Sequence, residues 1–366
     1  MIKKSLPLVL FTFIAIVLIV SLTACDQKKK ALGNEDDIYV IADTASYYTL
    51  EPALLTVFNK IVYTPQPENL FNLKRFNYDS FEKQKNKKNV LIICPLNTGS
   101  ELSKYVESIL DDKVIDLVMK DSAFFFTKKD LWAKDQLVMI VTGKSDEVIA
   151  KNLLLYSENL LYAFQKASDE RLFNSLYNEK YEKKDIEAKF LKTYGWLIYV
   201  QADFQLAMDK PNDNFVWLRR SPDSDMERWI FVHWIDNASP TLVNSDSIVT
   251  LRNKITEKFY RTSDDSTWVE ISEDNRSSKE VNFNGFYAIM TQGLWRFKDN
   301  SGGGPFISYT FYDEKTKRLY MIDGSIYAPK YYKKRLIHQM DVLLQSFKPK
   351  YMVDKDKAED ILSNLE

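Results

Sequence analysis

Histidine and cysteine are scarce in this sequence, which has two of each among 366 residues. The histidines, His233 and His338, do not fall with a cysteine at the spacing of a zinc site. Asp223-Ser224-Asp225 is the nearest approach to a calcium-binding loop and lacks the rest of that pattern. The sequence therefore predicts no metal site.

Motifs for nucleotide binding and for serine hydrolysis are also missing. The chain has no Walker loop, no G-x-G-x-x-G after a strand and no G-x-S-x-G elbow. The glycine-rich segment 301–305 leads into a predicted strand, so we interpret it as a turn or a close backbone approach. We expect no cofactor. Carboxylates are plentiful, so a pair of the glycosidase type is neither excluded nor identified.

Neither sign of charge dominates the chain. Fifty basic residues stand against 51 acidic ones, a net charge of −1, and removal of the first 24 residues would make it −3. This balance gives no electrostatic footprint for nucleic acid, which we exclude as a partner. Hydrophobic residues make up 45% and aromatic residues 14%, enough for a sizeable core.

The longest hydrophobic run lies at the start of the chain. Lys3 and Lys4 precede the apolar residues 6–20, and the segment ends at Leu22-Thr23-Ala24-Cys25. A run of about fifteen residues is short for a membrane span, which needs about twenty. The order is typical of a secretory signal, and its ending resembles the lipobox of bacterial lipoproteins. We expect cleavage before Cys25 and acylation of its sulfur, for example with palmitate; an uncleaved membrane helix is the alternative.

Lipidation of Cys25 would place the protein in the cell envelope. It would be anchored to the inner or the outer membrane, with its body facing the periplasm or the exterior. Lys28, Lys29 and Lys30 would lie at the lipid surface, where each cation near anionic head groups contributes about 1 kcal/mol. Acylation of Cys25 leaves Cys94 without a partner in the chain, and its apolar neighbours predict a buried, inert thiol.

The rest of the chain predicts an α+β protein with mixed and antiparallel sheets packed by helices. We divide it into a signal peptide (1–24), a tether (25–37), an N-terminal α/β half (38–180) and a C-terminal, β-rich α+β half (181–366). Both halves contain a strand, a glycine and then a helix, at Gly143 and at Gly324. A distant duplication would explain this likeness, and the ordinary grammar of α+β proteins would explain it too.

Periodicity predicts the elements of each half. In the first half we expect strands at 38–42, 70–76, 90–94, 124–126 and 137–141, and helices at 48–61, 101–110 and 145–177, with Ser100 as a helix cap. In the second half we expect strands at 196–200, 215–218, 229–234, 285–291, 306–312 and 319–322, and helices at 245–259 and 330–347.

Tryptophans and arginines of the second half form the candidate binding site. Trp217, Arg219 and Arg220 lie at the end of one predicted strand, and Trp295 and Arg296 are neighbours in another segment. If these strands pair, the side chains would converge on one sheet edge and hold an anionic or planar ligand. The alternative is that the tryptophans are core residues and that each arginine satisfies a carboxylate or a carbonyl.

Several segments resemble an uncharacterised bacterial lipoprotein family, the domain of unknown function 4837. They are residues 33–40, 215–219, 293–296, 303–306 and 327–329. The resemblance covers nearly the whole mature chain and implies a lipoprotein, but the family has no assigned catalytic residues. The closing hairpin and helix also resemble the last part of the PsbP/Mog1-like fold, which favours an antiparallel sheet packed by helices.

These observations predict a membrane-anchored lipoprotein without catalytic residues that binds an envelope protein or a small ligand through its second half. The alternative is a hydrolase of envelope glycan or lipid that uses carboxylates which the sequence does not single out.

Overall fold

The computed structural model describes residues 28–222 and 224–365, and it is an α+β protein. The predicted signal peptide and Cys25 lie outside the described residues. The chain forms two compact units. Unit 1 contains the described residues up to Asn59 together with Phe71–Ala167, and unit 2 contains Lys60–Leu70 together with the chain from Ser168 onward. Among the described residues, no helix is long and apolar enough to cross a membrane.

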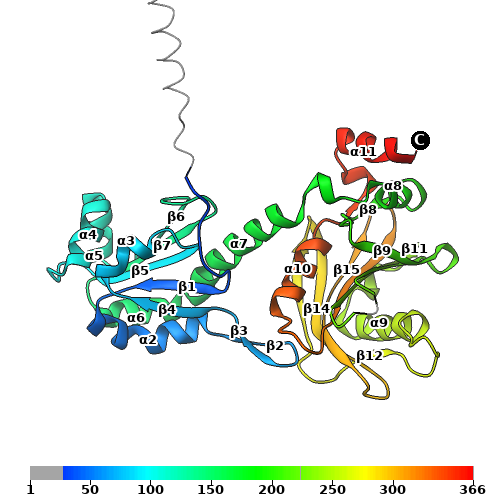
Figure 1. The fold of residues 1–366 in the computed structure, drawn as a ribbon, viewed down its shortest axis with the longest axis horizontal. Helices are drawn as coiled ribbons and strands as arrows, with labels where there is room; N and C mark the ends of the chain where they lie inside the picture. Colours follow the sequence, from blue (N-terminus) through cyan, green and yellow to red (C-terminus); the bar gives the residue numbers. More distant parts are fainter. Residues whose placement is uncertain (1–27, 223, 366) are drawn as a thin grey trace, which may run out of the picture. The chain divides into compact units, whose positions relative to one another are not determined.

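Unit 1 is built from one sheet and the helices on its two faces (Figure 1). Its strands are β1 (Asp37–Ile41), β4 (Asn72–Phe76), β5 (Asn89–Pro95), β6 (Phe125–Lys129) and β7 (Leu137–Gly143). Its helices are α2 (Thr44–Phe58), α3 (Phe81–Gln84), α4 (Glu101–Ile109), α5 (Asp112–Met119) and α6 (Asp146–Leu155), and α7 (Ser157–Leu176) runs from unit 1 into unit 2.

The strand order in unit 1 is β4-β1-β5-β7-β6, with the first four strands parallel and β6 antiparallel to β7. All residues of β1 and β5 are buried, as expected for parallel strands covered by helices on both faces. The predicted cap is confirmed, because the Ser100 hydroxyl accepts a hydrogen bond from the Ser103 amide at 3.1 Å. The single helix expected at 145–177 is wrong, because α6 ends before Tyr156 and α7 begins after it.

Unit 2 is built around an antiparallel sheet. Its main strands are β9 (Phe204–Lys210), β10 (Phe215–Arg220), β11 (Glu227–Asp236), β12 (Val269–Ile271), β13 (Ser277–Phe283), β14 (Phe286–Phe297), β15 (Gly303–Asp313) and β16 (Arg318–Tyr327). The short strands are β2 (Ile61–Tyr63), β3 (Pro67–Asn69), β8 (Trp196–Leu197) and β17 (Lys348–Pro349), and the helices are α8 (Lys184–Thr193), α9 (Ser245–Phe259), α10 (Lys334–Leu344) and α11 (Lys355–Leu362).

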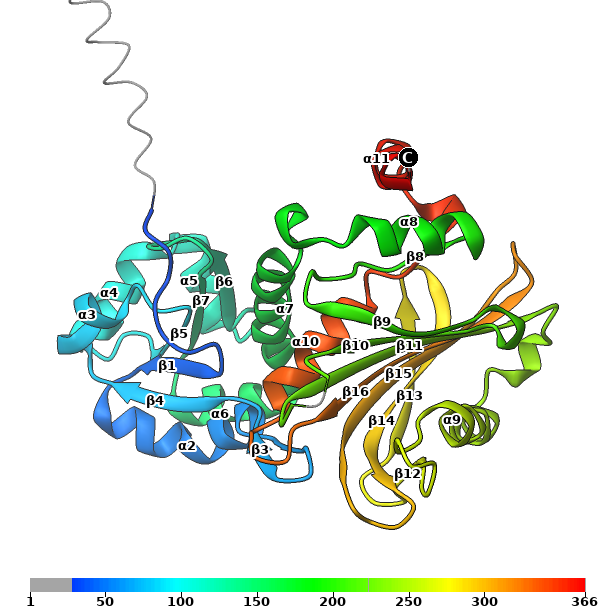
Figure 2. The same ribbon diagram turned by 45° about the vertical axis from the view of Figure 1, so that its right-hand side comes forward.

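The strand order in this sheet is β12-β14-β15-β16-β11-β10-β9, with β13 paired to β14. Alternate residues of β11 point to opposite faces, so Ile230 and Val232 pack in the core beneath α10 while Trp229 and Phe231 pack beneath α9. Figure 2 shows these two helices beside the long central strands. The sheet therefore separates two hydrophobic layers, and the candidate site lies on the α9 face.

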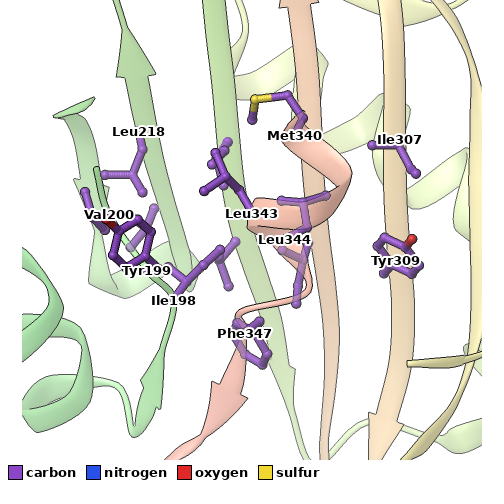
Figure 3. Close-up of a cluster of buried hydrophobic side chains, with 14 of the residues drawn as sticks. Ile198, Tyr199, Val200, Leu218, Ile307, Tyr309, Met340, Leu343, Leu344 and Phe347 are labelled. Carbon is purple, nitrogen blue, oxygen red and sulfur yellow. The ribbon is translucent and has the colours of Figure 1, made fainter. Parts of the chain in front are cut away.

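The core beneath α10 depends on a close approach between helix and strand. Met340, Leu343 and Leu344 of α10 lie over the strands in Figure 3, all at most 1% exposed. A Cβ atom added to Gly324 would lie 3.1 Å from the Met340 Cβ atom. The strand predicted at 319–322 is longer in the structure, because β16 continues to Tyr327, and Gly324 within it leaves room for the helix.

The sheets of the two units differ in kind. Unit 1 has a mostly parallel sheet in which helices connect the strands, whereas the large sheet of unit 2 is antiparallel. This difference favours the ordinary grammar of α+β proteins over a duplication as the source of the shared order of strand, glycine and helix. The last part of the predicted tether packs on unit 1, because the Ala31 amide donates to the Lys134 carbonyl at 2.8 Å and Ala31 is buried.

Two buried carboxyl groups lie close together near the start of α8: Glu182, just before the helix, and Glu187, within it. The Glu182 carboxylate accepts two hydrogen bonds from the Lys357 ammonium at 2.8 and 2.9 Å. The neighbouring Glu187 accepts a hydrogen bond from the Val200 amide at 2.7 Å and is 1% exposed. Burial, with the Glu182 carboxylate nearby, raises the pKa of Glu187 well above its usual 4.5. Glu187 therefore holds its proton to a higher pH in the folded chain than in the unfolded one.

Replacement of Glu187 by glutamine tests this proton. Because the folded chain keeps the proton and the unfolded chain loses it, the contribution of Glu187 to stability is greatest below pH 4.5 and falls as the pH rises above that value. The slope is at most about 1.4 kcal/mol per pH unit for one proton, and Glu187→Gln should remove it. Urea unfolding of both proteins from about pH 5 to about pH 8 measures the difference. Parallel pH profiles for the two proteins would contradict the assignment.

Candidate functional site

A cavity of about 360 Å³ opens on the α9 face of unit 2. Its walls come from five strands of the sheet (β10, β11, β12, β14 and β16) and from the segment that follows α9. The lining residues are Trp217, Arg219, Glu227, Trp229, Tyr260, Arg261, Thr262, Ser263, Val269, Phe297 and Tyr327. The volume is at the lower end of the range for small-molecule sites, which are usually apolar with a few polar groups.

Alternation along the strands gathers these side chains. Trp217 and Arg219 are two residues apart on β10, and Glu227 and Trp229 are two residues apart on β11. Because successive side chains of a strand point to opposite faces, each pair shares one face. Arg219 is directly opposite Trp229 in the β10–β11 register, and Glu227 is opposite Tyr327 in the β11–β16 register.

The floor of the cavity is aromatic. The Tyr260 ring lies 4.6 Å from the Trp217 ring and 5.3 Å from the Trp229 ring, measured between centroids. Trp295 lies behind this layer, 5.0 Å from Trp229 and 1% exposed, and its indole N–H donates to the Ile326 carbonyl at 3.2 Å. Trp295 is therefore a core residue that supports the wall and does not line the cavity.

The charged groups of the cavity are already paired. Arg219 donates to the Glu227 Oε2 atom from Nε at 3.1 Å and from Nη2 at 2.7 Å. The same oxygen accepts the Trp229 indole N–H at 2.7 Å. Arg261 forms an ion pair with Asp265 beside the cavity. A carboxylate fixed by an arginine and a tryptophan forms a planar polar edge next to the aromatic floor.

The other two predicted arginines lie elsewhere. Arg220 follows Arg219 and so points to the opposite face, where it pairs with Asp203 and donates to the Gln201 Oε1 atom at 3.3 Å. Arg296 pairs with Glu270 at 2.8 Å and donates to the Asn300 Oδ1 atom at 2.7 Å. Of the five candidate residues, the structure brings only Trp217 and Arg219 together at the cavity.

Two polar atoms of the aromatic floor have no hydrogen-bond partner. They are the Tyr260 hydroxyl and the Trp217 indole nitrogen, and both are shielded from solvent. Burial, with the Asp323 carboxylate nearby, raises the pKa of Tyr260 well above 10, so this hydroxyl keeps its proton. An unpartnered buried donor costs about 1–3 kcal/mol, and native proteins tolerate few of them.

A buried ion pair positions the wall that follows α9. Arg252 of α9 donates to the Asp323 carboxylate from Nε at 2.6 Å and from Nη2 at 3.2 Å, and both side chains are 0% exposed. The Ser325 hydroxyl bridges the pair, and the guanidinium lies 3.8 Å from the centre of the Phe306 ring. This pair fixes α9 on the sheet and thereby places Tyr260, the residue immediately after it.

The histidines take no part in the cavity. The His233 Nδ1 atom donates a hydrogen bond to the Asn214 carbonyl at 3.0 Å, and burial lowers the pKa of His233 to about 4. The His338 Nε2 atom, on α10, lies 2.5 Å from the Asp169 Oδ1 atom, on α7. Among residues 28–222 and 224–365, no group of three histidine, cysteine or acidic side chains is placed to hold a metal ion.

Glu227, Trp229, Tyr260 and Tyr327 are not among the site residues predicted from the sequence. For Glu227 and Trp229 a signal existed, because they flank Arg228 on the strand that contains the predicted segment 229–234. Because Glu227 and Trp229 are two residues apart on one strand, the sequence could have predicted that their side chains share a face. Tyr260 had no such signal, because its position depends on how α9 packs on the sheet.

The Tyr260 hydroxyl can be tested by its removal. Tyr260→Phe should leave the free energy of unfolding unchanged or raise it by up to about 1 kcal/mol, because the lost hydroxyl has no partner. Tyr309→Phe is the matched control, since the Tyr309 hydroxyl donates to the Asp341 carboxylate at 2.5 Å and should cost about 1–3 kcal/mol. Urea unfolding measures both variants. A loss in Tyr260→Phe as large as that in Tyr309→Phe would mean that Tyr260 has a partner in solution.

Comparisons with known proteins give families without a known function. Residues 31–177 match a domain of unknown function (DUF8532), and residues 183–346 match a domain of unknown function (DUF4837). The expectation that the second family covers nearly the whole mature chain is therefore wrong. No curated protein matches the chain. A solved structure of a mutant of the protein Mog1 is similar over 45% of this chain and 94% of its own, with 11% identity and a TM-score of 0.28. Residues 183–346 of this chain are therefore similar to the family described as the domain of unknown function DUF4837.

Proposed function

We propose that this protein is a lipid-anchored binding protein of the cell envelope that takes a small, flat, uncharged ligand in the cavity around Trp217. The anchor is the Cys25 sulfur, and the binding domain is unit 2. The proposal combines the lipobox at the end of the hydrophobic run with the aromatic cavity.

The observation that carries the binding role is the pair of unpartnered donors in the aromatic floor. Tyr260 and Trp217 line the cavity, and each retains a polar atom without a hydrogen-bond partner. A ligand that supplies acceptor oxygens after a small displacement of these side chains would recover part of that cost. The rings of Trp217, Trp229 and Tyr327 offer flat apolar faces to the body of the same ligand.

The pairing of charges favours an uncharged ligand. An anion at Arg219 would approach the Glu227 carboxylate, which is 6% exposed and already bound to Arg219 and Trp229. Like charges in a poorly hydrated site repel strongly. A neutral ring with hydroxyl or carbonyl oxygens avoids this repulsion and still bonds to the polar edge. The cavity has one lining carboxylate, Glu227, whereas glycoside hydrolysis commonly uses two.

Calorimetric titration of the detergent-solubilised full chain with methyl glucoside, indole and benzoate tests the binding role. We expect one of the neutral rings to bind more tightly than benzoate. Trp217→Phe should weaken that binding by about tenfold through loss of the larger ring and its N–H. Arg220→Ala is the control, because Arg220 lies on the same strand and pairs with Asp203 away from the cavity. Absence of saturable binding, or equal binding by Trp217→Phe, would refute the site.

Expression of the wild type beside Cys25→Ala tests the anchor. We expect the wild type to lose its first 24 residues, gain acyl mass and enter the detergent phase, because the thiol of Cys25 is the alkylated atom. The variant should do none of these. Mass spectrometry and detergent phase partition measure both proteins. If both keep the N-terminus and stay in the membrane fraction, the first segment is an ordinary helical anchor.

A further inference from the structure

The chain enters unit 1 through a lysine-rich surface. Residues 28–32 lie between two loops at the edge where β5 and β7 begin. The backbone of Lys30 forms an isolated parallel β-bridge with that of Lys134, and the backbone of Leu32 forms one with that of Lys87. We call the surface formed by residues 28–36, 82–88 and 128–135 the anchor face.

Backbone hydrogen bonds make the anchor face one continuous structure. The Lys134 amide donates to the Lys29 carbonyl at 2.9 Å, and the Leu32 amide donates to the Asn86 carbonyl at 3.0 Å. The buried Gln136 side chain joins the two loops, because its Nε2 atom donates to the Lys85 carbonyl at 2.5 Å and to the Lys87 carbonyl at 2.7 Å. The lysines of the three segments are therefore held together by the fold.

The anchor face is positive although the chain is not. Its three segments contain ten lysines and five acidic residues, a net charge of +5, whereas the whole chain has a net charge of −1. The pairing of Lys30 with Asp135 is long and exposed, since the two groups lie 3.8 Å apart and Lys30 is 75% exposed. Lys28 is bound to the carbonyls of Asp130 and Leu131 at 2.6 and 3.1 Å, which leaves its charge uncompensated.

An exposed hydrophobic side chain lies within this positive surface. Leu32 is 62% exposed, between Lys30 and the loop that contains Lys87. A leucine surrounded by lysines matches the chemistry of a membrane interface, where apolar side chains enter the head-group region and cations contact anionic lipids.

The short segment between Cys25 and Lys28 would keep the proposed lipid anchor close to the anchor face. Cys25 is three residues before Lys28, which is bound to unit 1 through Asp130 and Leu131. Even a fully extended chain spans at most about 3.6 Å per residue, so an acylated Cys25 lies within about 11 Å of the anchor face. That distance is close to the Debye length of about 8 Å at physiological ionic strength.

We propose that the anchor face docks flat on a bilayer surface that contains anionic phospholipid. The inference rests on the proposed acylation of Cys25 and adds an orientation for unit 1. The edge where β5 and β7 begin faces the lipid, and the edge where they end, at Pro95 and Gly143, faces away from it.

A fluorescent probe on the anchor face measures docking. The acylated full chain with Leu32→Cys would be labelled with a polarity-sensitive fluorophore, while Cys94 is 0% exposed and escapes labelling. The protein is then reconstituted into vesicles of phosphatidylcholine, with or without phosphatidylglycerol, that carry spin-labelled lipid as quencher. We expect quenching with phosphatidylglycerol, and its loss in 1 M salt, where the Debye length is about 3 Å. The same probe at Thr98→Cys, at the opposite edge of the sheet, should stay unquenched.

Two triple variants separate docking from general electrostatics. Lys29→Gln, Lys128→Gln and Lys134→Gln together should lower the ratio of docked to undocked protein by about fivefold per lysine, on the order of a hundredfold. The control neutralises Lys104, Lys120 and Lys144 near the opposite edge and should leave quenching unchanged. If wild-type protein carries acyl chains and binds vesicles but its Leu32→Cys probe stays unquenched, docking is refuted while the anchor stands. If it neither carries acyl chains nor binds, the proposed anchor itself fails.

Discussion

The ion pair between Arg252 and Asp323 is the constraint on which unit 2 depends. Both side chains are fully buried, so each charge is stable only because the other is present. Two hydrogen bonds, the Ser325 hydroxyl and the face of the Phe306 ring together replace much of the lost hydration. The pair fixes α9 on one face of the sheet at one position. Tyr260, and with it the cavity wall, follows from that position because it is the next residue after the helix.

The pairing of charged side chains also decides what the cavity can bind. The arginines of the sequence-predicted site each have a carboxylate partner, namely Glu227, Asp203 and Glu270. The interpretation in which each arginine satisfies a carboxylate therefore describes the observed contacts, and Trp295 is a core residue. What remains for a ligand is an aromatic floor, a polar edge without net charge and two unused donors. Such a site selects by ring shape and by hydrogen-bond acceptors rather than by charge.

Local signals in the sequence were sufficient for much of the secondary structure. The helix expected at 245–259 and the Ser100 cap are confirmed. Both could be predicted because they depend on side chains close in sequence. The predicted strand 319–322 stops short of Gly324, whose role depends on how the next helix, α10, packs its Met340 on the sheet. Gly304 was read as a turn or a close approach. A Cβ atom there would lie 1.9 Å from the Ile326 carbonyl oxygen, so the close approach is the reason. The burial of Arg252 could not be predicted from the sequence either, because its partner, Asp323, is 71 residues away.

The topology of unit 1 links the two ends of its sheet to different surroundings. A chain that enters a central parallel strand arrives at the edge where the parallel strands begin, so residues 28–36 necessarily lie beside the starts of β5 and β7. In open α/β sheets, ligands bind at the opposite edge, where a strand order reverses. Here β1 lies between β4 and β5, so that reversal falls between β1 and β5. An anchor immediately before residue 28 would hold the first edge against the lipid. The second edge, with the beginnings of α2 and α4, would remain open to solvent.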